Sequence, residues 1–312
     1  MANFEKQTFF YRAAKIILPL ILAAICLYYI LTGFQWLEIW RTLRKINLLM
    51  FLASSISTTL IFWLLRTLRW AMLLKNEKLA ISFFKLYLYT AVTIGFANFT
   101  PFQSGEALKV ELLRKYGGER FSGYNYFFFE KLLDLLVIST LAAFGVLILF
   151  EFDIGNRLQL AIAGLIVGLA ILTLALIVAS KKTPEKLRIY RRVVPAQLSN
   201  LFSAVLLTLA SWATMILGWK FIFQSAAIDL TIFQTTAIIS LTTVIGVVSF
   251  VPGAIGVSEI SIAAMLSQLG YEIVTAQTGA IMIALYSLVI LILSAIHLII
   301  LKAVNAVKQK AI

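Results

Sequence analysis

The sequence predicts an all-α polytopic membrane protein made of two inverted repeats, each consisting of a span, a second span, a re-entrant hairpin and a third span. The 312 residues are 61% hydrophobic and 13% charged, with a mean hydropathy of +0.96, whereas soluble domains carry about 25% charged residues. Apolar runs close to the ~20 residues that cross a bilayer recur along the whole chain. Two proline-containing segments also repeat at a constant offset.

The first repeat is expected over residues 1–150, and it begins with an apolar run at 14–32. Basic residues precede this run as in a signal peptide, but it lacks a small-residue cleavage site, so we interpret it as a retained span. Residues 33–47 are predicted to form a surface helix. Trp36 and Trp40 of that helix suit the membrane interface.

The remaining elements of the first repeat are a span at 48–66, a hairpin near 81–117 and a span at 124–150. The second arm of the hairpin carries too many charges for a lipid-facing span. Arg66 and Arg69, at the end of the second span, are interpreted as headgroup anchors at the cytoplasmic surface.

The second repeat is expected over residues 151–312. Its predicted elements are a span at 158–180, a span at 198–224, a hairpin near 233–270 that is interrupted at Pro252, and a last span at 279–301.

The placement of basic residues favours hairpins over full crossings at both proline segments. Basic clusters occur at the N-terminus, at 66–85, at 109–120, at 181–192 and at the C-terminus, whereas the connections at 225–232 and 267–278 contain no Lys or Arg. If every apolar stretch crossed the membrane, the basic clusters would fall on both sides, against the positive-inside rule. Hairpins that open to the cytoplasm and to the outside, respectively, remove this conflict and place both termini in the cytoplasm of a cell (plasma or inner) membrane protein. The alternative is that the prolines only kink ordinary spans.

The two proline segments match each other at an offset of 151 residues. They read TIGFANFTPFQSG and VIGVVSFVPGAIG, and the flanking spans obey the same offset. Three crossings per half is an odd number, so the second half is expected upside down relative to the first. Inverted repeats with broken helices are typical of alternating-access transporters.

The residues around the two turns are candidate ligand-binding positions. Pro101 suits the first position of a helix, with Thr100 as its cap. A helix start offers free N–H groups and a partial positive charge, which suit an anionic headgroup. Small residues permit close backbone approach to a ligand, or alternatively only tight helix packing. The candidates from the turns are Asn98, Thr100, Pro101, Gly105, Pro252, Gly253 and Gly256.

Several charged residues lie in or next to apolar segments, where a charge costs at least about 2.5–3.5 kcal/mol. Glu106 and Lys109 are three residues apart and are expected to pair, while Glu130 and Asp134 share a helix face. Together these charges predict a polar path for a headgroup, with a carboxylate that takes up a proton; the alternative is structural ion pairing. The charged candidates are Glu106, Lys109, Glu130, Lys131, Asp134 and Glu259.

Two further polar residues are given structural roles. Lys220 is expected to extend its amine to the interface. His297, the one histidine, is expected to pack or to form a helix–helix hydrogen bond.

These motifs resemble the lysylphosphatidylglycerol synthase transmembrane-region family, which includes the membrane half of the bacterial multiple peptide resistance factor. The matching positions are Asn98-x-x-Pro101-x-x-x-Gly105-Glu106-x-x-Lys109, Glu130-Lys131-x-x-Asp134 and Pro252-x-x-x-Gly256-x-x-Glu259. Lys109 and Lys131 stand where arginine is common in the family, which keeps the charge but loses the bidentate fork. The resemblance implies lipid translocation. Aminoacyl-lipid synthesis is not expected, because the aminoacyltransferase domain is not in these 312 residues.

The expected function is therefore a flippase- or scramblase-like lipid transporter that moves a phospholipid or glycolipid headgroup by alternating access between the two hairpin tips. A membrane enzyme that modifies lipid headgroups, a small-solute secondary transporter and a non-transporting assembly protein are the alternatives.

The net charge of +13 favours membrane lipids with anionic or phosphate headgroups as partners, and nucleic acid is not expected. A second copy of the chain and an enzyme that makes the lipid are further candidate partners. No cofactor is expected. Cys26, the single cysteine, lies inside the first apolar run, so neither a disulfide nor a thiolate metal site is predicted.

Overall fold

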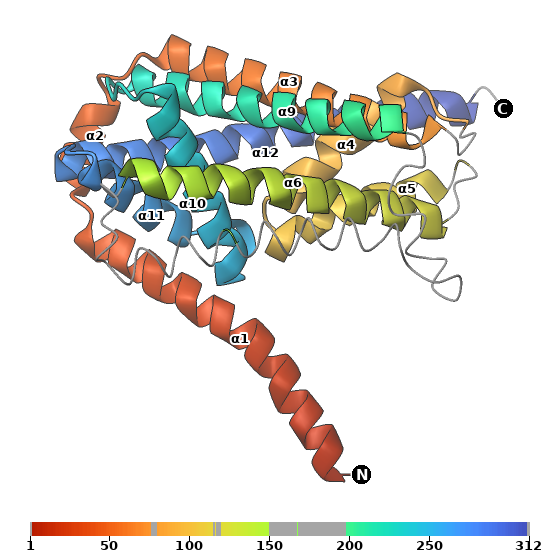
Figure 1. The fold of residues 1–312 in the computed structure, drawn as a ribbon, viewed down its shortest axis with the longest axis horizontal. Coiled ribbons are helices and arrows are strands. Elements are labelled where there is room, and N and C mark those ends of the chain that lie inside the picture. The colour runs from red at the N-terminus through yellow and green to blue at the C-terminus, as the bar shows by residue number, and fades with distance from the viewer. Residues whose placement is uncertain are drawn as a thin grey trace.

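The computed structural model describes residues 2–75, 80–114, 116, 120–149, 167 and 198–310. All regular structure in these residues is helical (Figure 1). The predicted span at 158–180, apart from residue 167, and the basic cluster at 181–192 lie outside the described residues.

The prediction of an all-α membrane protein with several spans is confirmed. Four helices of the described part are long and apolar enough to cross a membrane, and a bent helix pair adds a fifth candidate. The four are contained in α3 (Leu48–Leu73), α9 (Leu198–Ser225), α10 (Ile232–Ser249) and α12 (Ile273–Lys310).

The bent pair is α1 (Ala2–Gly33) followed by α2 (Trp36–Leu43), with a bend of 79° between the helix segments from residue 17 onward. The surface helix predicted over 33–47 is present as the shorter α2. Ile39 is its buried residue, while Trp36 and Trp40 are exposed. This pattern is that of an amphipathic helix lying on the apolar bundle.

α3 and α9 lie side by side along the bundle (Figure 1). At one end the backbone N–H of Asn47 donates to the carbonyl of Ser225 at 2.8 Å, and the Asn47 side chain caps α3 by accepting from the N–H of Met50. At this end of the bundle, a backbone hydrogen bond therefore joins the start of α3 to the end of α9. α3 is 26 residues long, so its other end is about 39 Å away.

A first helical hairpin is formed by α4 (Phe83–Ala97) and α5 (Leu108–Arg114), with the 3₁₀ segment η2 (Pro101–Ala107) between them. Ser82 caps the start of α4 by accepting from the N–H of Lys85. The helix ends at Ala97, with Asn98 as its C-cap, and Thr100 is extended, as expected for a residue before proline. The hydroxyls of Tyr89 and Tyr116 are 3.2 Å apart, and the Lys85 amine lies 5.0 Å from the centre of the Tyr116 ring, so the chain returns beside the first half of α4.

A second helical hairpin is formed by α10 and α11 (Val257–Gln268), with the short segment η4 (Pro252–Ala254) between them. Thr231 and Gln234 form a capping box at the start of α10. The Tyr271 hydroxyl donates to the carbonyl of Asp229 at 2.7 Å, which joins the segment after α11 to the segment before α10. This hairpin also returns to the end from which it began.

The tips of the two hairpins contact each other, and Gly253 is the contact residue. Its φ is +66°, and a Cβ atom built there would lie 2.6 Å from the carbonyl oxygen of Asn98. Two segments about 150 residues apart in sequence therefore meet through their backbones, at a position where a side chain does not fit.

The remaining long helix, α6 (Arg120–Leu149), packs against α10 and begins beside α5 (Figure 1). It carries the carboxylates of the site described next. The main hydrophobic core contains Trp63, Ile138, Phe223, Ile238 and Ile283, which come from α3, α6, α9, α10 and α12.

Candidate functional site

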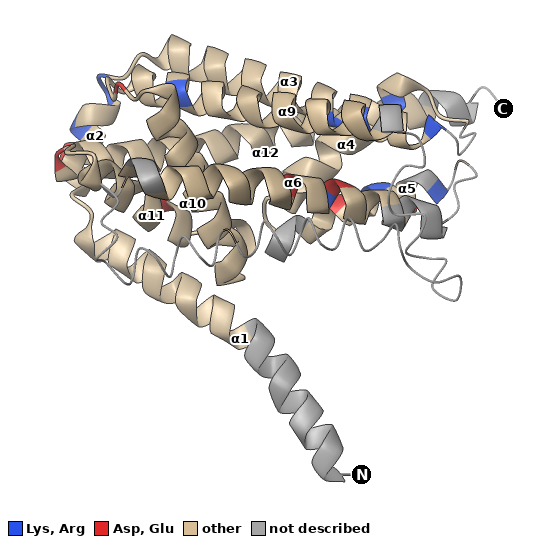
Figure 2. Cartoon of the chain, viewed as in Figure 1, with Lys and Arg blue, Asp and Glu red and all other residues tan. Residues whose placement is uncertain are grey.

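Seven charged side chains form one connected cluster inside the bundle. They come from α3, from η2 and α5, and from α6, and the acidic part of α6 lies in the half of the bundle nearer to α5 (Figure 2). The members are Arg66, Arg69, Glu106, Lys109, Glu130, Lys131 and Asp134.

Arg66 and Arg69 are buried, with 5% and 0% of their surface exposed. The interpretation of these two residues as headgroup anchors at the membrane surface is therefore wrong. The reason is that α3 continues to Leu73, beyond the predicted span end at residue 66, so both arginines lie on a helix face inside the bundle. There Asp134 accepts from Arg66, and Glu130 accepts from the Nε of Arg69 at 2.9 Å.

Lys109 links the hairpin to α6. Its Nζ lies 3.0 Å from the Oε1 of Glu106 and 2.5 Å from the Oε2 of Glu130. It also sits 4.2 Å from the ring centre of Trp70, in a cation–π arrangement. The predicted pairing of Glu106 with Lys109 is confirmed, and Lys131 donates to the other oxygen of Glu106.

The contacts join the seven charges in strict alternation. The order is Arg66, Asp134, Arg69, Glu130, Lys109, Glu106, Lys131. We call this arrangement the charge chain. Among these seven side chains, four are cations and three are carboxylates.

Thr208 of α9 completes the surroundings of Arg69. Its hydroxyl lies 2.6 Å from the Nη1 of Arg69, and the side chain is fully buried. Thr208 and the two arginines were missed as site residues. The arginines could have been predicted as site residues from their i, i+3 spacing together with the acidic pair on α6. A threonine in an apolar helix, such as Thr208, has no sequence feature that marks it as a site residue.

At each proline turn, a side chain of the protein accepts from a backbone N–H group. Pro101 is the first residue of η2, as predicted, and the Thr100 hydroxyl accepts from the N–H of Gly105 at 2.8 Å. At the second turn, the Glu259 carboxylate accepts from the N–H of Gly256 at 2.6 Å and from the Ser258 hydroxyl at 3.1 Å. Both turns thus provide their own acceptors in this conformation.

The sequence-predicted residues therefore divide into three groups. The charged candidates other than Glu259 meet in the charge chain. Glu259 instead belongs to the second turn, with Pro252, Gly253 and Gly256, while Asn98, Thr100, Pro101 and Gly105 belong to the first. The two turns touch where Gly253 meets Asn98.

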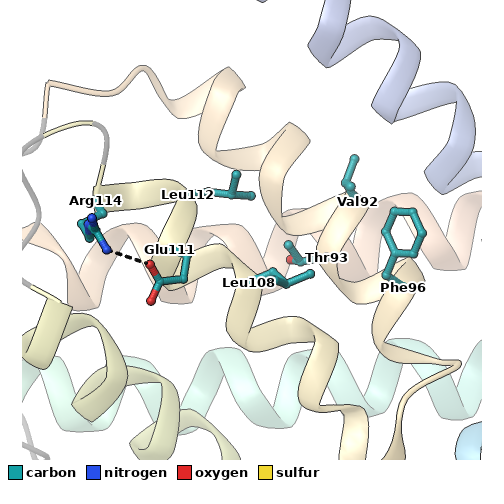
Figure 3. Close-up of a pocket in the computed structure, with 7 residues that line it drawn as sticks. All are labelled: Val92, Thr93, Phe96, Leu108, Glu111, Leu112 and Arg114. Carbon is teal, nitrogen blue, oxygen red and sulfur yellow. Dashed lines mark hydrogen bonds and ion pairs between the residues drawn. The ribbon is translucent and has the colours of Figure 1, made fainter.

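A groove of about 660 Å³ opens between the two arms of the first hairpin (Figure 3). Its lining is mainly apolar, and an ion pair between Arg114 and Glu111 at 3.4 Å closes one side. The lining residues are Val92, Thr93, Phe96, Leu108, Glu111, Leu112 and Arg114.

α5 separates the groove from the charge chain. Leu108, Glu111 and Leu112 face the groove, at the i, i+3, i+4 spacing of one helix face. Lys109 is 1% exposed and faces the charge chain. One short helix therefore has an apolar volume on one side and buried charges on the other.

The packing expected for His297 is confirmed, while the interfacial position expected for Lys220 stays a prediction. Lys220 is partly exposed, donates to the carbonyl of Leu230 and lies 3.5 Å from the Asp229 carboxylate. His297 bonds to the carbonyl of Leu293 in its own helix and packs edge-on against Trp63 and Tyr87. In the part of the chain that the structure describes, no three His, Cys, Asp or Glu side chains are grouped as a metal site requires.

Comparison with known proteins gives two matches that agree with this architecture. The family model described as "Lysylphosphatidylglycerol synthase TM region" matches residues 16–295. The UPF0104 membrane protein PH1989 of Pyrococcus horikoshii is 25% identical over 280 residues, which cover 76% of this chain and 83% of that protein.

Proposed function

The chain belongs to the lysylphosphatidylglycerol synthase transmembrane-region family, and from this premise we propose that it is a lipid transporter of the flippase or scramblase type. It moves the headgroup of a phospholipid or glycolipid through the protein while the acyl chains stay in the bilayer. The observation that carries the proposal is the charge chain, buried among helices long and apolar enough to span a membrane.

The energetic cost of the charge chain favours a functional role over structural pairing. Each charge in the bilayer core costs at least about 2.5–3.5 kcal/mol before pairing, and apolar packing could join the same helices without that cost.

The proposed mechanism is alternating access between two inverted halves, residues 1–150 and 151–312. Each half contributes one re-entrant hairpin whose tip reaches the middle of the membrane. The proposal is supported by the return of each hairpin to its own starting end and by the contact between Gly253 and Asn98. In this scheme the touching tips close the central path, and rocking of the halves separates them.

The groove on the first hairpin supports the same function. It offers apolar volume within a membrane-embedded hairpin, one helix diameter from the buried charges. An acyl chain held there would keep its headgroup close to the charge chain.

We further propose that the lipid is moved without covalent change, so that the protein is not an enzyme. Incubation of the purified protein with a lipid mixture, followed by mass analysis of the lipids, tests this point. A new lipid product that depends on the protein would instead establish the enzyme alternative.

Transport is tested with a fluorescent phospholipid in proteoliposomes, by reduction of the outward-facing label. The double variant Glu106→Gln and Glu259→Gln removes a carboxylate of the charge chain and the acceptor at the second turn. We expect flipping at least about tenfold slower, equivalent to about 1.4 kcal/mol of barrier. Glu38→Gln, which changes an exposed carboxylate of α2, is the matched control.

Unchanged flipping in a folded double variant, judged by its thermal unfolding, would remove the proposed mechanism. Equal slowing by Glu38→Gln would show that the assay responds to any loss of a carboxylate.

A further inference from the structure

α2 presents an exposed aromatic and basic surface at one end of the bundle (Figure 2). Trp36, Leu37 and Trp40 are its exposed large side chains. α2 is bent by 79° from the preceding helix, so when α1 crosses the membrane, α2 runs nearly along the membrane surface. Tryptophan concentrates at that depth, because its ring is apolar while its N–H can reach water or a headgroup.

The orientation of α2 is fixed by contacts with the second half of the chain. The backbone N–H of Gln35 donates to the Oε1 of Gln277 at 2.9 Å, and the Nε2 of Gln277 lies 3.4 Å from the Gly33 carbonyl oxygen. The buried Ile39 packs in one cluster with Ala263 of α11. The exposed face of α2 is therefore held beside the second hairpin and directed away from the bundle.

Two cations that follow α2 have no anionic partner in the protein. Arg41 pairs with Glu38, but Arg44 and Lys45 are exposed and form no ion pair with any residue that the structure describes. The Arg44 guanidinium lies 5.3 Å from the centre of the Trp40 ring, in a cation–π arrangement. This contact positions one cation at the interface and leaves its hydrogen-bond donors available to a ligand.

An apolar surface continues from these cations along α3. Leu48, Leu52 and Ile56 are exposed and four residues apart, so they lie on one face of the helix. They extend over about 12 Å from the start of α3. A phospholipid whose phosphate is held at Arg44 and Lys45 would lay an acyl chain on this face.

We propose that Trp40, Arg44 and Lys45 form a surface site for an anionic phospholipid in the leaflet at this end of the bundle. We call it the α2 site. It is separate from the charge chain, because Arg44 precedes Arg66 by most of the length of α3. The inference requires only that the chain is embedded in a membrane, and it does not depend on the proposed transport.

Charge determines which lipids the α2 site selects. Two unpaired cations attract a lipid with a net negative charge, whereas a zwitterionic lipid adds a cation that they repel. Because α2 lies beside the second hairpin, the site raises the concentration of anionic lipid next to that hairpin. Different anionic headgroups should be enriched alike, since the site recognises the charge of the phosphate region.

The test measures which lipids lie next to the α2 site in a bilayer. In a Cys26→Ser background, a dansyl label is attached at Leu49→Cys, an exposed position at the start of α3, and the full chain is reconstituted in phosphatidylcholine. Equal trace amounts of spin-labelled phosphatidylglycerol, phosphatidylserine or phosphatidylcholine are added, and quenching of the label reports the local concentration of each. We expect at least about fivefold stronger quenching by both anionic lipids than by phosphatidylcholine.

Two controls locate the effect. A label at Ile61→Cys, about 18 Å further along α3, should be quenched alike by all three lipids. For the first label, the preference should also fall in about 1 M salt, where the screening length is about 3 Å.

Substitutions assign the preference to the two cations. The double variant Arg44→Gln and Lys45→Gln should reduce it to less than about twofold. The matched control, Arg114→Gln with Lys302→Gln, removes two exposed cations at the other end of the bundle (Figure 1), and it should keep the wild-type preference. Thermal unfolding checks that both variants are folded.

The proposal is overturned by equal quenching by all three lipids in the wild type, or by wild-type preference in the folded Arg44→Gln and Lys45→Gln variant. Enrichment of only one of the two anionic lipids would contradict recognition by charge. Flipping is not measured in this experiment. A protein that enriches anionic lipid without flipping would therefore contradict the proposed function alone, while flipping without enrichment would contradict the α2 site alone.

Discussion

At the residue scale, Arg69 is the most connected member of the charge chain. Its guanidinium contacts Glu130, both oxygens of Asp134 and the hydroxyl of Thr208, and no part of its side chain is exposed. Burying a charge is tolerated here because carboxylates and a hydroxyl accept from all three of its nitrogens. Because Arg69 makes all of these contacts, we expect the site to be sensitive to substitution of Arg69.

Arg69→Met is expected to destabilise the protein by about 3–5 kcal/mol, because it leaves Glu130 and Asp134 buried with fewer cations. Thermal unfolding of the purified protein measures the effect. Arg41→Met removes an exposed arginine that pairs with Glu38, and it should cost less than about 1 kcal/mol. Equal shifts for the two variants would mean that Arg69 contributes no more than a surface ion pair.

At the element scale, the two hairpins are joined by their backbones at the tips, and this contact requires glycine at position 253. The residue has a positive φ, and the Asn98 carbonyl fills the space of a Cβ atom. The contact joins the two halves of the chain at the hairpin tips, so the size of residue 253 limits how closely the tips approach.

Gly253→Ala is expected to separate the tips and to lower the unfolding temperature more than Gly270→Ala. Gly270 has a φ of +87° but nothing within 4 Å of a built Cβ, so both variants suffer backbone strain of about 1–2 kcal/mol. The difference between them therefore reports the clash with Asn98 alone. Equal unfolding temperatures would show that the tips part without cost.

The groove on the first hairpin gives a second prediction at this scale. Leu108→Trp adds bulk to the groove face of α5, and we expect flipping to slow several-fold with little change in unfolding temperature. Phe144→Trp, at a residue of α6 that is 63% exposed, is the control and should flip as the wild type does. Normal flipping in Leu108→Trp would exclude the groove from the lipid path.

At the scale of the whole molecule, the two hairpins open at opposite ends of the bundle. Ser225, just before the second hairpin, bonds to Asn47 at the start of α3. Val110, in the second arm of the first hairpin, packs in one cluster with Trp70 and Leu74 at the far end of α3. In a membrane, these ends would lie on opposite surfaces.

Cysteine labelling tests this arrangement in cells. In a Cys26→Ser background, Arg114→Cys should react only from the cytoplasm and Asp229→Cys only from outside, since these side chains are 60% and 83% exposed. A membrane-impermeant maleimide, with and without permeabilisation, distinguishes the two surfaces. Labelling of both positions from one side would exclude the inverted arrangement and the cytoplasmic termini proposed with it.

The local part of the site was predictable from sequence spacing. Glu106 and Lys109 are three residues apart, and Glu130 and Asp134 are four apart, so helix geometry alone places each pair on one face. The break before Pro101 was also predictable, because proline restricts the residue before it. These conclusions need no knowledge of which helices are neighbours.

The role of Arg66 and Arg69 was not predictable in that way. An arginine near the end of an apolar run either extends to the surface or turns inward, and the choice depends on available partners. Here the partner carboxylates lie 61 to 68 residues away in sequence, on α6. The surface interpretation followed the usual behaviour of arginine and failed because helix packing supplied Glu130 and Asp134.

The sequence by itself therefore determined the membrane-protein class, most of the helix positions and the helix breaks at Pro101 and Pro252, because bilayer thickness and backbone geometry act on short segments. Only the tertiary structure decided that α3, η2, α5 and α6 converge, that their seven charges alternate, and that Gly253 meets Asn98. The physical reason is that ion pairing and close packing act between segments distant in sequence, and no local pattern specifies which segments become neighbours.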